Sequence, residues 1–380
     1  MSAVVAVLAS RAAGETRAAA TAETVAKLIK RGAIVRVEAG AGGSAGVSDA
    51  DYAAAGAEVV APGEAVRGAD VLLCVDGPAV DRLEGARPGA LLLGLLDPLA
   101  DRERVEGYAR AGVDAVAMEF LPRISRAQSM DVLSSQSNLA GYKAVVDAAA
   151  AYGRAFPMMM TAAGTVSAAR VFVMGVGVAG LQAIATARRL GAQVSATDVR
   201  SATREQIQSL GAKPIFVETV AGVAGEGAGG YAGETSPEYQ AAQAELVSTH
   251  IARQDIVVTT ALIPGRPAPR LISDAQIATM RPGSVVFDLA VSRGGNVEGS
   301  VADRVVERHG VLILGHSNPA AHLASDASAL YSRNLLNLLT AFWDDGAGAP
   351  VLPDDDEIVV GARVTHRGRV TGERLSASAP

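Results

Sequence analysis

The sequence predicts an α/β protein built from two doubly wound domains with parallel sheets. First, short runs of Val, Leu and Ile alternate with helical stretches along most of the 380 residues. Such runs fit strands that are buried on both faces of a parallel sheet. Second, a glycine-rich turn stands between an apolar run and a helix near the middle of the chain. We therefore expect two Rossmann-like domains joined by long crossover helices.

The first domain is expected to contain a series of strands with helices between them. A helix over residues 21–31 has Thr21 as its N-cap and Glu23 in its first turn, which suits the positive end of a helix dipole. A short helix starts at Ser48, and Asp51 completes a capping box. The expected strands are residues 3–8, 34–38, 58–60, 71–75, 91–96 and 115–117.

Two long helical stretches mark where the chain passes between the domains. The Ala-rich residues 138–152 fit a helix leaving the first domain, and residues 327–340 fit a return helix. The expected domains are residues 1–136 with 327–380, and residues 137–326. The tail is expected to contain a linker over 344–356 and a strand pair formed by 357–364 and 369–370.

The second domain continues the alternation after the glycine-rich turn. Residues 222–237 contain six glycines and almost no large apolar side chain. Such a segment cannot bury enough surface to offset its ordering entropy, so we expect a mobile surface loop. The other expected elements are strands at 193–197, within 209–217, and at 256–260, 285–288 and 311–314, with a helix over 237–252.

The turn after residues 171–174 has the pattern of a dinucleotide-binding site. Gly175 permits a tight turn, Gly177 lets the backbone approach a pyrophosphate, and Gly180 lets the following helix pack on the strand. A pyrophosphate there contacts unpaired N–H groups at the positive end of the helix dipole. A glycine-rich turn without a ligand is the alternative interpretation.

Asp198 indicates which dinucleotide this turn binds. It lies eighteen residues after Gly180, at the end of the strand over residues 193–197. A carboxylate there can accept hydrogen bonds from both hydroxyls of the adenosine ribose, whereas a 2′-phosphate would meet its negative charge. The sequence therefore predicts NAD(H) rather than NADP(H).

Composition limits the other classes of function and the location. The net charge of −6 gives no indication of nucleic acid or an anionic membrane as a partner. The single cysteine, Cys74, excludes internal disulfides and favours a cytoplasmic setting. The N-terminus lacks the features of a signal peptide, and no apolar run reaches the roughly 18 residues of a membrane-spanning helix. The five histidines lack the spacing of metal ligands, so no metal is expected.

A second candidate site lies in residues 123–138, just before the first crossover helix. The segment carries guanidinium, amide, carboxylate and hydroxyl groups and few apolar side chains. Capping the next helix would need one such side chain, such as Ser135, Ser137 or Asn138. The excess suits a polar shell around a nicotinamide ring, its carboxamide and its ribose. The loop that carries Tyr231 could close over such a shell.

Several stretches together resemble one family. They are RISRAQSMDVLSSQSNLAGY, GVGVAGLQA with ATDVR, GGYAGE, and VVTTALIPGRPAP. They resemble the NAD(H)-binding domain I of proton-translocating NAD(P) transhydrogenases, and the resemblance covers essentially the whole chain. The stretch VEAGAGGSAGVSDADY is shared with the related alanine dehydrogenases.

The resemblance implies a function, partners and site residues. Domain I of this family passes hydride directly from NADH to NADP⁺ on a partner subunit, and a membrane-spanning subunit couples this exchange to proton translocation. It implies a cytoplasmic homodimer, held at the inner face of the membrane by those partners, as a stand-alone subunit or a piece of a longer one. The catalytic residues that it implies are Arg123, Gln128, Asp131, Ser134 and Tyr231, with Gln128 reaching towards the partner's nucleotide. The cofactor-binding residues, besides the three glycines, are Val178, Ala179, Asp198, Val199, Arg200, Gly230, Gln243 and Leu262.

Two alternatives remain open. An alanine-dehydrogenase-like enzyme would need the Lys and His bases of that family, which are absent from residues 72–76 and 93–97. Hydride transfer between two nicotinamides moves no proton at the ring and needs no such base, so this absence agrees with the transhydrogenase interpretation. A non-catalytic module that senses NAD is the second alternative.

Overall fold

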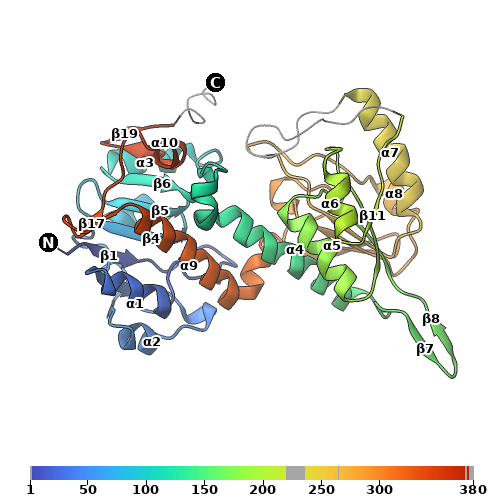
Figure 1. Cartoon of the computed structure of the whole chain (residues 1–380), viewed down its shortest axis with the longest axis horizontal. Helices are drawn as coiled ribbons and strands as arrows, with labels where there is room; N and C mark the ends of the chain where they lie inside the picture. Colours follow the sequence, from blue (N-terminus) through green and yellow to red (C-terminus); the bar gives the residue numbers. More distant parts are fainter. Residues whose placement is uncertain (1, 220–235, 264, 373–374, 376–380) are drawn as a thin grey trace. The chain divides into compact units, whose positions relative to one another are not determined.

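The chain divides into two compact units, each an α/β domain (Figure 1). The computed structural model describes residues 2–219, 236–263, 265–372 and 375. The first unit comprises residues 1–136 and 321–380, and the second comprises residues 137–320. The expected loop over residues 222–237, with Gly230 and Tyr231, lies almost entirely outside the described residues.

The first unit is built on a six-stranded sheet with the order β3-β2-β1-β4-β5-β6, and every pairing is parallel. This order belongs to doubly wound folds, with the switch point between β1 and β4. Its strands are β1 (Val4–Val7), β2 (Ile34–Glu38), β3 (Glu58–Val60), β4 (Val71–Asp76), β5 (Leu91–Leu95) and β6 (Asp114–Ala117). Its helices are α1 (Ala22–Lys30), α2 (Asp49–Ala54), α3 (Arg102–Arg110), α9 (Ala324–Ala341) and α10 (Glu357–Ala362).

The second unit repeats this order in a seven-stranded sheet, β11-β10-β9-β12-β13-β15-β14, with the switch point between β9 and β12. Only β14, which pairs with β15, is antiparallel within this sheet as described. The strands are β9 (Arg170–Met174), β10 (Gln193–Thr197), β11 (Lys213–Pro214), β12 (Ile256–Thr259), β13 (Val285–Asp288), β14 (Arg304–Arg308) and β15 (Val311–Gly315). The helices are α5 (Val178–Arg189), α6 (Thr203–Ser209), α7 (Pro237–Ile251) and α8 (Asp274–Ile277), with most of α4 (Val132–Ala151).

Alternate residues of the central strand β9 face two separate cores. Val171 and Val173 pack in one core with Ala183 of α5. Phe172 packs in the other core with Val247 of α7. The strand is therefore buried on both faces by helices, and the predicted fold class is confirmed.

The predicted caps of α1 and α2 are present, but two other elements differ from expectation. Thr21 accepts a hydrogen bond from the N–H of Thr24, and Ser48 and Asp51 form the reciprocal capping box. The tail was predicted as a strand over residues 357–364, but it forms α10, because Asp356 caps the N–H of Ile358 at 2.9 Å. The final strand pair is β18 (Thr365–His366) with β19 (Arg369–Val370), after the pair β16 (Trp343–Asp344) with β17 (Ala349–Pro350).

Helix α4 begins six residues before the expected start at residue 138. The Asp131 carboxylate accepts a hydrogen bond from the N–H of Ser134 at 2.9 Å, which satisfies a donor of the first turn. The polar side chains from Ser134 to Asn138 are therefore helical, whereas the sequence predicted a loop.

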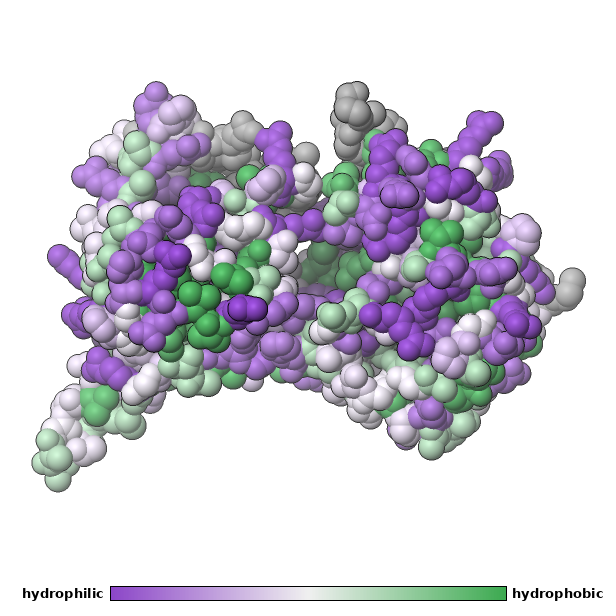
Figure 2. Space-filling model, turned by 180° about the vertical axis from the view of Figure 1, so that it is seen from behind, coloured by the Kyte–Doolittle hydropathy of each residue, from purple (hydrophilic) through white to green (hydrophobic). Residues whose placement is uncertain are grey.

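A β-hairpin that the sequence did not predict projects from the second unit (Figure 1). It consists of β7 (Met159–Thr161) and β8 (Gly164–Val166). Met158 and Met160 are 62% and 80% exposed, and residues 157–169 include no charged side chain. Seen from behind, the hairpin is green and white to its tip (Figure 2). Among the helices of the described residues, none is long and apolar enough to cross a membrane.

Candidate nucleotide-binding site

The glycine-rich turn follows β9, at the switch point of the second unit's sheet. Doubly wound sheets bind ligands at the carboxyl ends of their strands, at this point. Gly175 has a φ of +100°, which L side chains rarely adopt, and its carbonyl accepts a hydrogen bond from Thr260 Oγ1 at 3.0 Å. A Cβ on Gly180 would lie 1.9 Å from that carbonyl oxygen. Glycine is therefore required for α5 to begin this close to β9.

Gly177 and the start of α5 leave room for a ligand. Apart from Gly177 itself and its two chain neighbours, no atom of the described residues lies within 4 Å of where a Cβ of Gly177 would stand, so packing does not require this glycine. Gly177 is the N-cap of α5 and makes no side-chain capping bond. The backbone N–H groups of the first turn, which includes Val178 and Ala179, thus meet the requirements of a pyrophosphate site.

Asp198 lies directly against this turn. It follows β10 and is 7% exposed. Its Oδ2 accepts a hydrogen bond from the N–H of Val176 at 2.7 Å, and its Oδ1 accepts one from the N–H of Arg200 at 2.8 Å. The structure therefore brings the carboxylate and the glycine turn together, as the spacing of the dinucleotide motif predicts.

The other predicted cofactor residues lie on three segments of the same unit. Val199 is half-buried between Asp198 and the buried Arg200. Leu262 follows β12 and is 39% exposed, so it offers an apolar surface near the carboxyl edge of the sheet. Gln243 is half-buried in α7.

The polar segment predicted as the second site belongs to the first unit. Arg123 and Gln128 are exposed, and Gln128 lies in a 3₁₀ turn over Ser125–Met130. Asp131 accepts from both the N–H and the Oγ of Ser134, at 2.9 and 2.5 Å. Arg126 forms a bidentate ion pair with Asp356, at 2.7 and 2.8 Å, and so supports the local fold.

The segments in which alanine-dehydrogenase-like chemistry would need a Lys and a His, residues 72–76 and 93–97, contain neither residue. The carboxylate in the first segment, Asp76, is half-buried at the end of β4. Cys74 and Leu96 are both buried, and burial raises the pKa of the Cys74 thiol. A nearby buried guanidinium, that of Arg17, contacts Glu15 at 2.6 Å and donates to the side-chain oxygen of Gln136 at 3.0 Å. The Arg17–Glu15 pair was missed in the sequence, because nothing in the local pattern shows that these side chains are buried.

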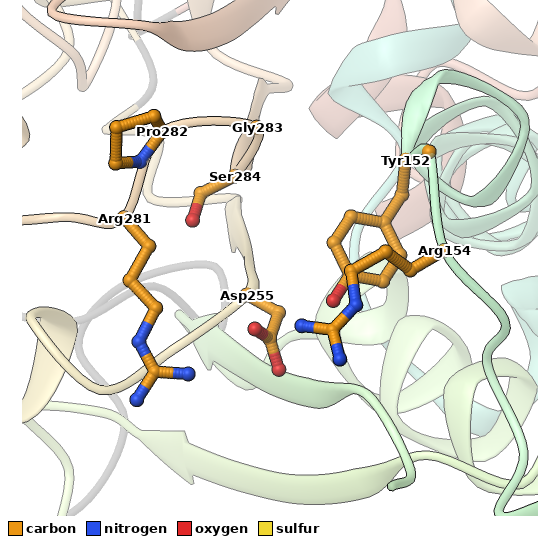
Figure 3. A pocket seen from close by; sticks show the side chains of 8 residues that line it. Tyr152, Arg154, Asp255, Arg281, Pro282, Gly283 and Ser284 are labelled. Atoms are coloured by element: carbon orange, nitrogen blue, oxygen red, sulfur yellow. The ribbon is translucent and has the colours of Figure 1, made fainter. Parts of the chain in front are cut away.

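A pocket of about 300 Å³ in the second unit lies at the opposite edge of the sheet (Figure 3). Asp255 and Ser284 in its lining immediately precede β12 and β13, whereas the glycine turn follows β9. The side chains of Tyr152 and Arg154 point towards Asp255, and burial followed by the charge of Asp255 raises the pKa of Tyr152. This pocket is therefore separate from the predicted dinucleotide site.

Two further residues shape the dinucleotide turn and were not predicted. A Cβ on Gly141 of α4 would lie 2.0 Å from the carbonyl oxygen of Ala179, so this glycine lets α4 approach the start of α5. A lone glycine inside an Ala-rich helix was the available signal. Tyr239 of α7 is buried, and after burial itself the charge of Asp198 raises its pKa; no sequence pattern indicated this proximity.

Comparison with known proteins places this geometry in a family. The alanine dehydrogenase/PNT N-terminal domain matches residues 6–140, and the C-terminal domain of that family matches residues 144–373. The chain is 50% identical to a polypeptide of the NAD(P) transhydrogenase alpha subunit of Rhodospirillum rubrum, over 96% of this chain and 97% of that one.

The chain belongs to the alanine dehydrogenase/PNT family. Within this family it is 47% identical to the corresponding NAD(P) transhydrogenase alpha-subunit polypeptide of Rickettsia prowazekii, over 94% of this chain and 93% of that one. A crystal structure of transhydrogenase from Sinorhizobium meliloti matches with a TM-score of 0.88 and 51% identity, over 97% and 99% of the two chains. An alanine dehydrogenase of Mycobacterium tuberculosis is 31% identical over 75% of this chain and 72% of that one. The predicted resemblance to the transhydrogenase alpha subunit is therefore confirmed, and family membership supports a nicotinamide dinucleotide as the ligand.

Proposed function

We propose that this chain is the NAD(H)-binding subunit of a proton-translocating NAD(P) transhydrogenase. In this role it holds NADH for direct hydride transfer to NADP⁺ bound on a partner subunit, and a membrane-spanning subunit couples the transfer to proton translocation. The observation that carries the proposal is a dinucleotide turn complete to Asp198, in a chain similar over nearly its whole length to named transhydrogenase subunits.

The residues of the second unit bind and orient the nucleotide. The first turn of α5, with Val178 and Ala179, receives the pyrophosphate, and Asp198 receives the adenosine ribose. Leu262 and Gln243 line the path towards the nicotinamide, with Val199 and Arg200 beside the ribose. The bound NADH supplies the hydride at C4 of its dihydronicotinamide, and the protein contributes position and exclusion of water.

The polar segment of the first unit carries the proposed catalytic residues. Gln128 has an exposed amide, which suits a contact that spans from this chain towards the partner's nucleotide. Asp131 and Ser134, which hydrogen-bond to each other, orient the nicotinamide ring. Arg123 donates charge-assisted hydrogen bonds to NADH. Gly230 and Tyr231, which lie outside the described residues, are the remaining residues that the family resemblance implies for the site.

An alanine-dehydrogenase-like activity is the alternative that shared family membership favours. It needs a carboxylate anchor and a proton acceptor. Arg17 is already paired with Glu15, and the segments expected to carry the Lys and His bases, residues 72–76 and 93–97, contain neither residue. A module that senses NAD without catalysis would share the turn and Asp198, and it differs by giving no hydride exchange with any partner.

The proposed assembly is a homodimer at the cytoplasmic face of the membrane, attached through its partner subunits. The hairpin of β7 and β8 supports self-association, because it exposes three consecutive methionines, Met158 to Met160. Exposed apolar patches of this kind mark protein contacts.

Reconstitution tests the proposal. The isolated chain is expected to bind NADH and to oxidise none of it, including with pyruvate and ammonia. Addition of the NADP(H)-binding and membrane subunits should produce hydride exchange with an NADP⁺ analogue. In that complex, Gln128→Asn should lower the single-turnover rate of hydride transfer by about 10²-fold at nearly unchanged NADH affinity. A displacement of the reacting carbons by about 1 Å is enough for such a loss of rate. Turnover of pyruvate and ammonia by the isolated chain would favour the dehydrogenase instead.

A further inference from the structure

Arg200 occupies the hydrogen-bonding positions of Asp198 that a ribose needs. Its Nε donates to Oδ1 at 2.9 Å and its Nη2 donates to Oδ2 at 3.0 Å. The backbone N–H groups of Arg200 and Val176 donate to the same two oxygens at 2.8 and 2.7 Å. Each carboxylate oxygen therefore accepts two hydrogen bonds.

This ion pair is buried. The side chains of Arg200 and Asp198 are 9% and 6% exposed, and Arg200 Nη2 also donates to the carbonyl of Val176 at 3.2 Å. Because the backbone bonds fix the carboxylate against the glycine turn, the guanidinium is the group that must yield when ribose hydroxyls bind. The guanidinium thus lies next to the position of the ribose 2′-hydroxyl in the proposed NAD(H) complex.

An arginine at this place is the group that accommodates a 2′-phosphate in NADP-binding Rossmann domains. The chain therefore carries both kinds of specificity group, a carboxylate and a guanidinium, in direct contact. As long as the guanidinium is neutralised by Asp198, it cannot attract a second anion without leaving a buried carboxylate unpaired.

We propose that Arg200 is a binding residue for the 2′-phosphate of adenosine nucleotides, which its ion pair with Asp198 keeps from binding that phosphate. Asp198 then excludes NADP(H) in two ways, because its charge repels the 2′-phosphate and because it holds the arginine. The proposal deepens the NAD(H) site proposed above and rests on it. It makes the Asp198–Arg200 pair, rather than Asp198 alone, the unit that sets nucleotide choice.

Equilibrium binding of nucleotide fragments by the full chain tests this. The probes are 5′-AMP and 2′,5′-ADP, which differ in the 2′-phosphate, together with NADH and NADPH. Asp198→Asn keeps an acceptor for the N–H of Val176 and removes the charge, so it should weaken NADH and strengthen 2′,5′-ADP by about tenfold or more. Asp198→Asn combined with Arg200→Gln should lose that gain, and Arg200→Gln alone should still reject 2′,5′-ADP. Asp198→Ser provides a second carboxylate-free variant if Asp198→Asn does not fold.

The outcomes distinguish the proposed role of Arg200 from the proposed NAD(H) site on which it rests. A gain for 2′,5′-ADP that disappears with Arg200 and with added salt supports the inference. No gain in a folded carboxylate-free variant, or a gain that survives Arg200→Gln, overturns it while leaving the NAD(H) site intact. A native chain that binds neither 5′-AMP nor NADH overturns the proposed site itself.

Discussion

The glycines of the dinucleotide turn differ in what a single methyl group would do to each. A Cβ at Gly180 would overlap a backbone carbonyl oxygen at 1.9 Å, whereas a Cβ at Gly177 would meet no described atom within 4 Å beyond its own chain neighbours. Gly177 has an ordinary negative φ of −81°. Packing therefore accounts for the glycine at 180 and does not account for the glycine at 177.

Alanine substitutions should distinguish these two glycines. Gly180→Ala should lower the free energy of unfolding by about 3 kcal/mol, because backbone atoms must shift to admit the methyl group. Gly177→Ala should leave the stability nearly unchanged and weaken NADH binding at least about tenfold, since the methyl group enters the space left for the pyrophosphate. Denaturant unfolding and NADH titration of both variants measure the contrast. Equal NADH affinity in Gly177→Ala and the native chain would show that the pyrophosphate lies elsewhere.

Glu119 gives the first unit a pH-dependent stability. Burial raises the pKa of its carboxyl from 4.5 to about 7, and the N–H of Asp97, a residue with a φ of +44°, donates to its Oε1 at 2.5 Å. Because the folded pKa lies above the unfolded pKa, folding takes up a proton between these values. The contribution of Glu119 to the free energy of unfolding is therefore fully present below pH 4.5. It is lost as the pH rises through 7, which lowers the free energy of unfolding by roughly 1–3 kcal/mol.

Glu119→Gln should remove this slope, because a neutral amide retains an acceptor for Asp97 and has no charge to desolvate. The variant should be more stable than the native chain at pH 8, and the difference should vanish towards pH 4.5. Urea unfolding at a series of pH values measures it. Parallel pH profiles for the two proteins would exclude Glu119 as the titrating group.

At the scale of elements, the hairpin of β7 and β8 has exposed residues on both strands. A two-stranded hairpin is marginally stable by itself in water, and this one has no charged residue from 157 to 169. Contact with a second copy would bury its methionines.

Met160→Asp should therefore weaken the proposed homodimer, shifting the dimer dissociation constant upward by about tenfold or more, since a carboxylate cannot be buried unpaired. Val305→Asp is the matched control, because Val305 is an exposed apolar residue, 57% exposed, on a strand of the same unit. Sedimentation velocity over a concentration series gives the measurement. An unchanged dissociation constant in Met160→Asp would exclude the hairpin from the interface.

The strands, the glycine turn and the Asp198 contact could be predicted because each depends on local pattern. Buried parallel strands such as Val171 to Met174 read as continuous apolar runs, and Asp198 follows at the expected spacing. The start of α4 could not be predicted, because Asp131 competes for the cap with several other polar residues. The pairs Arg17–Glu15 and Asp198–Arg200 depend on burial and on side-chain direction. Sequence spacing does not report either.

At the scale of the whole molecule, the chain contains the same strand order twice. The switch point of the second unit carries the glycine turn and Asp198, whereas β4 at the switch point of the first unit ends at the half-buried Asp76. The same fold thus occurs twice with different side chains at its switch point, and fold alone does not determine function. The proposed chemistry needs a second nucleotide from a partner subunit, so the activity belongs to the assembly.

Isotope transfer in the reconstituted assembly tests the central claim most directly. NADH deuterated at C4 is mixed with NADP⁺ in the complex of this chain with its NADP(H)-binding and membrane subunits, and the NADPH formed is analysed by mass spectrometry. If transfer is direct and the deuterium is on the face of NADH C4 from which hydride leaves, the NADPH formed should carry one deuterium. No deuterium should appear in the water. NADPH whose new C4 hydrogen comes from solvent, with either face of NADH labelled, would contradict the account.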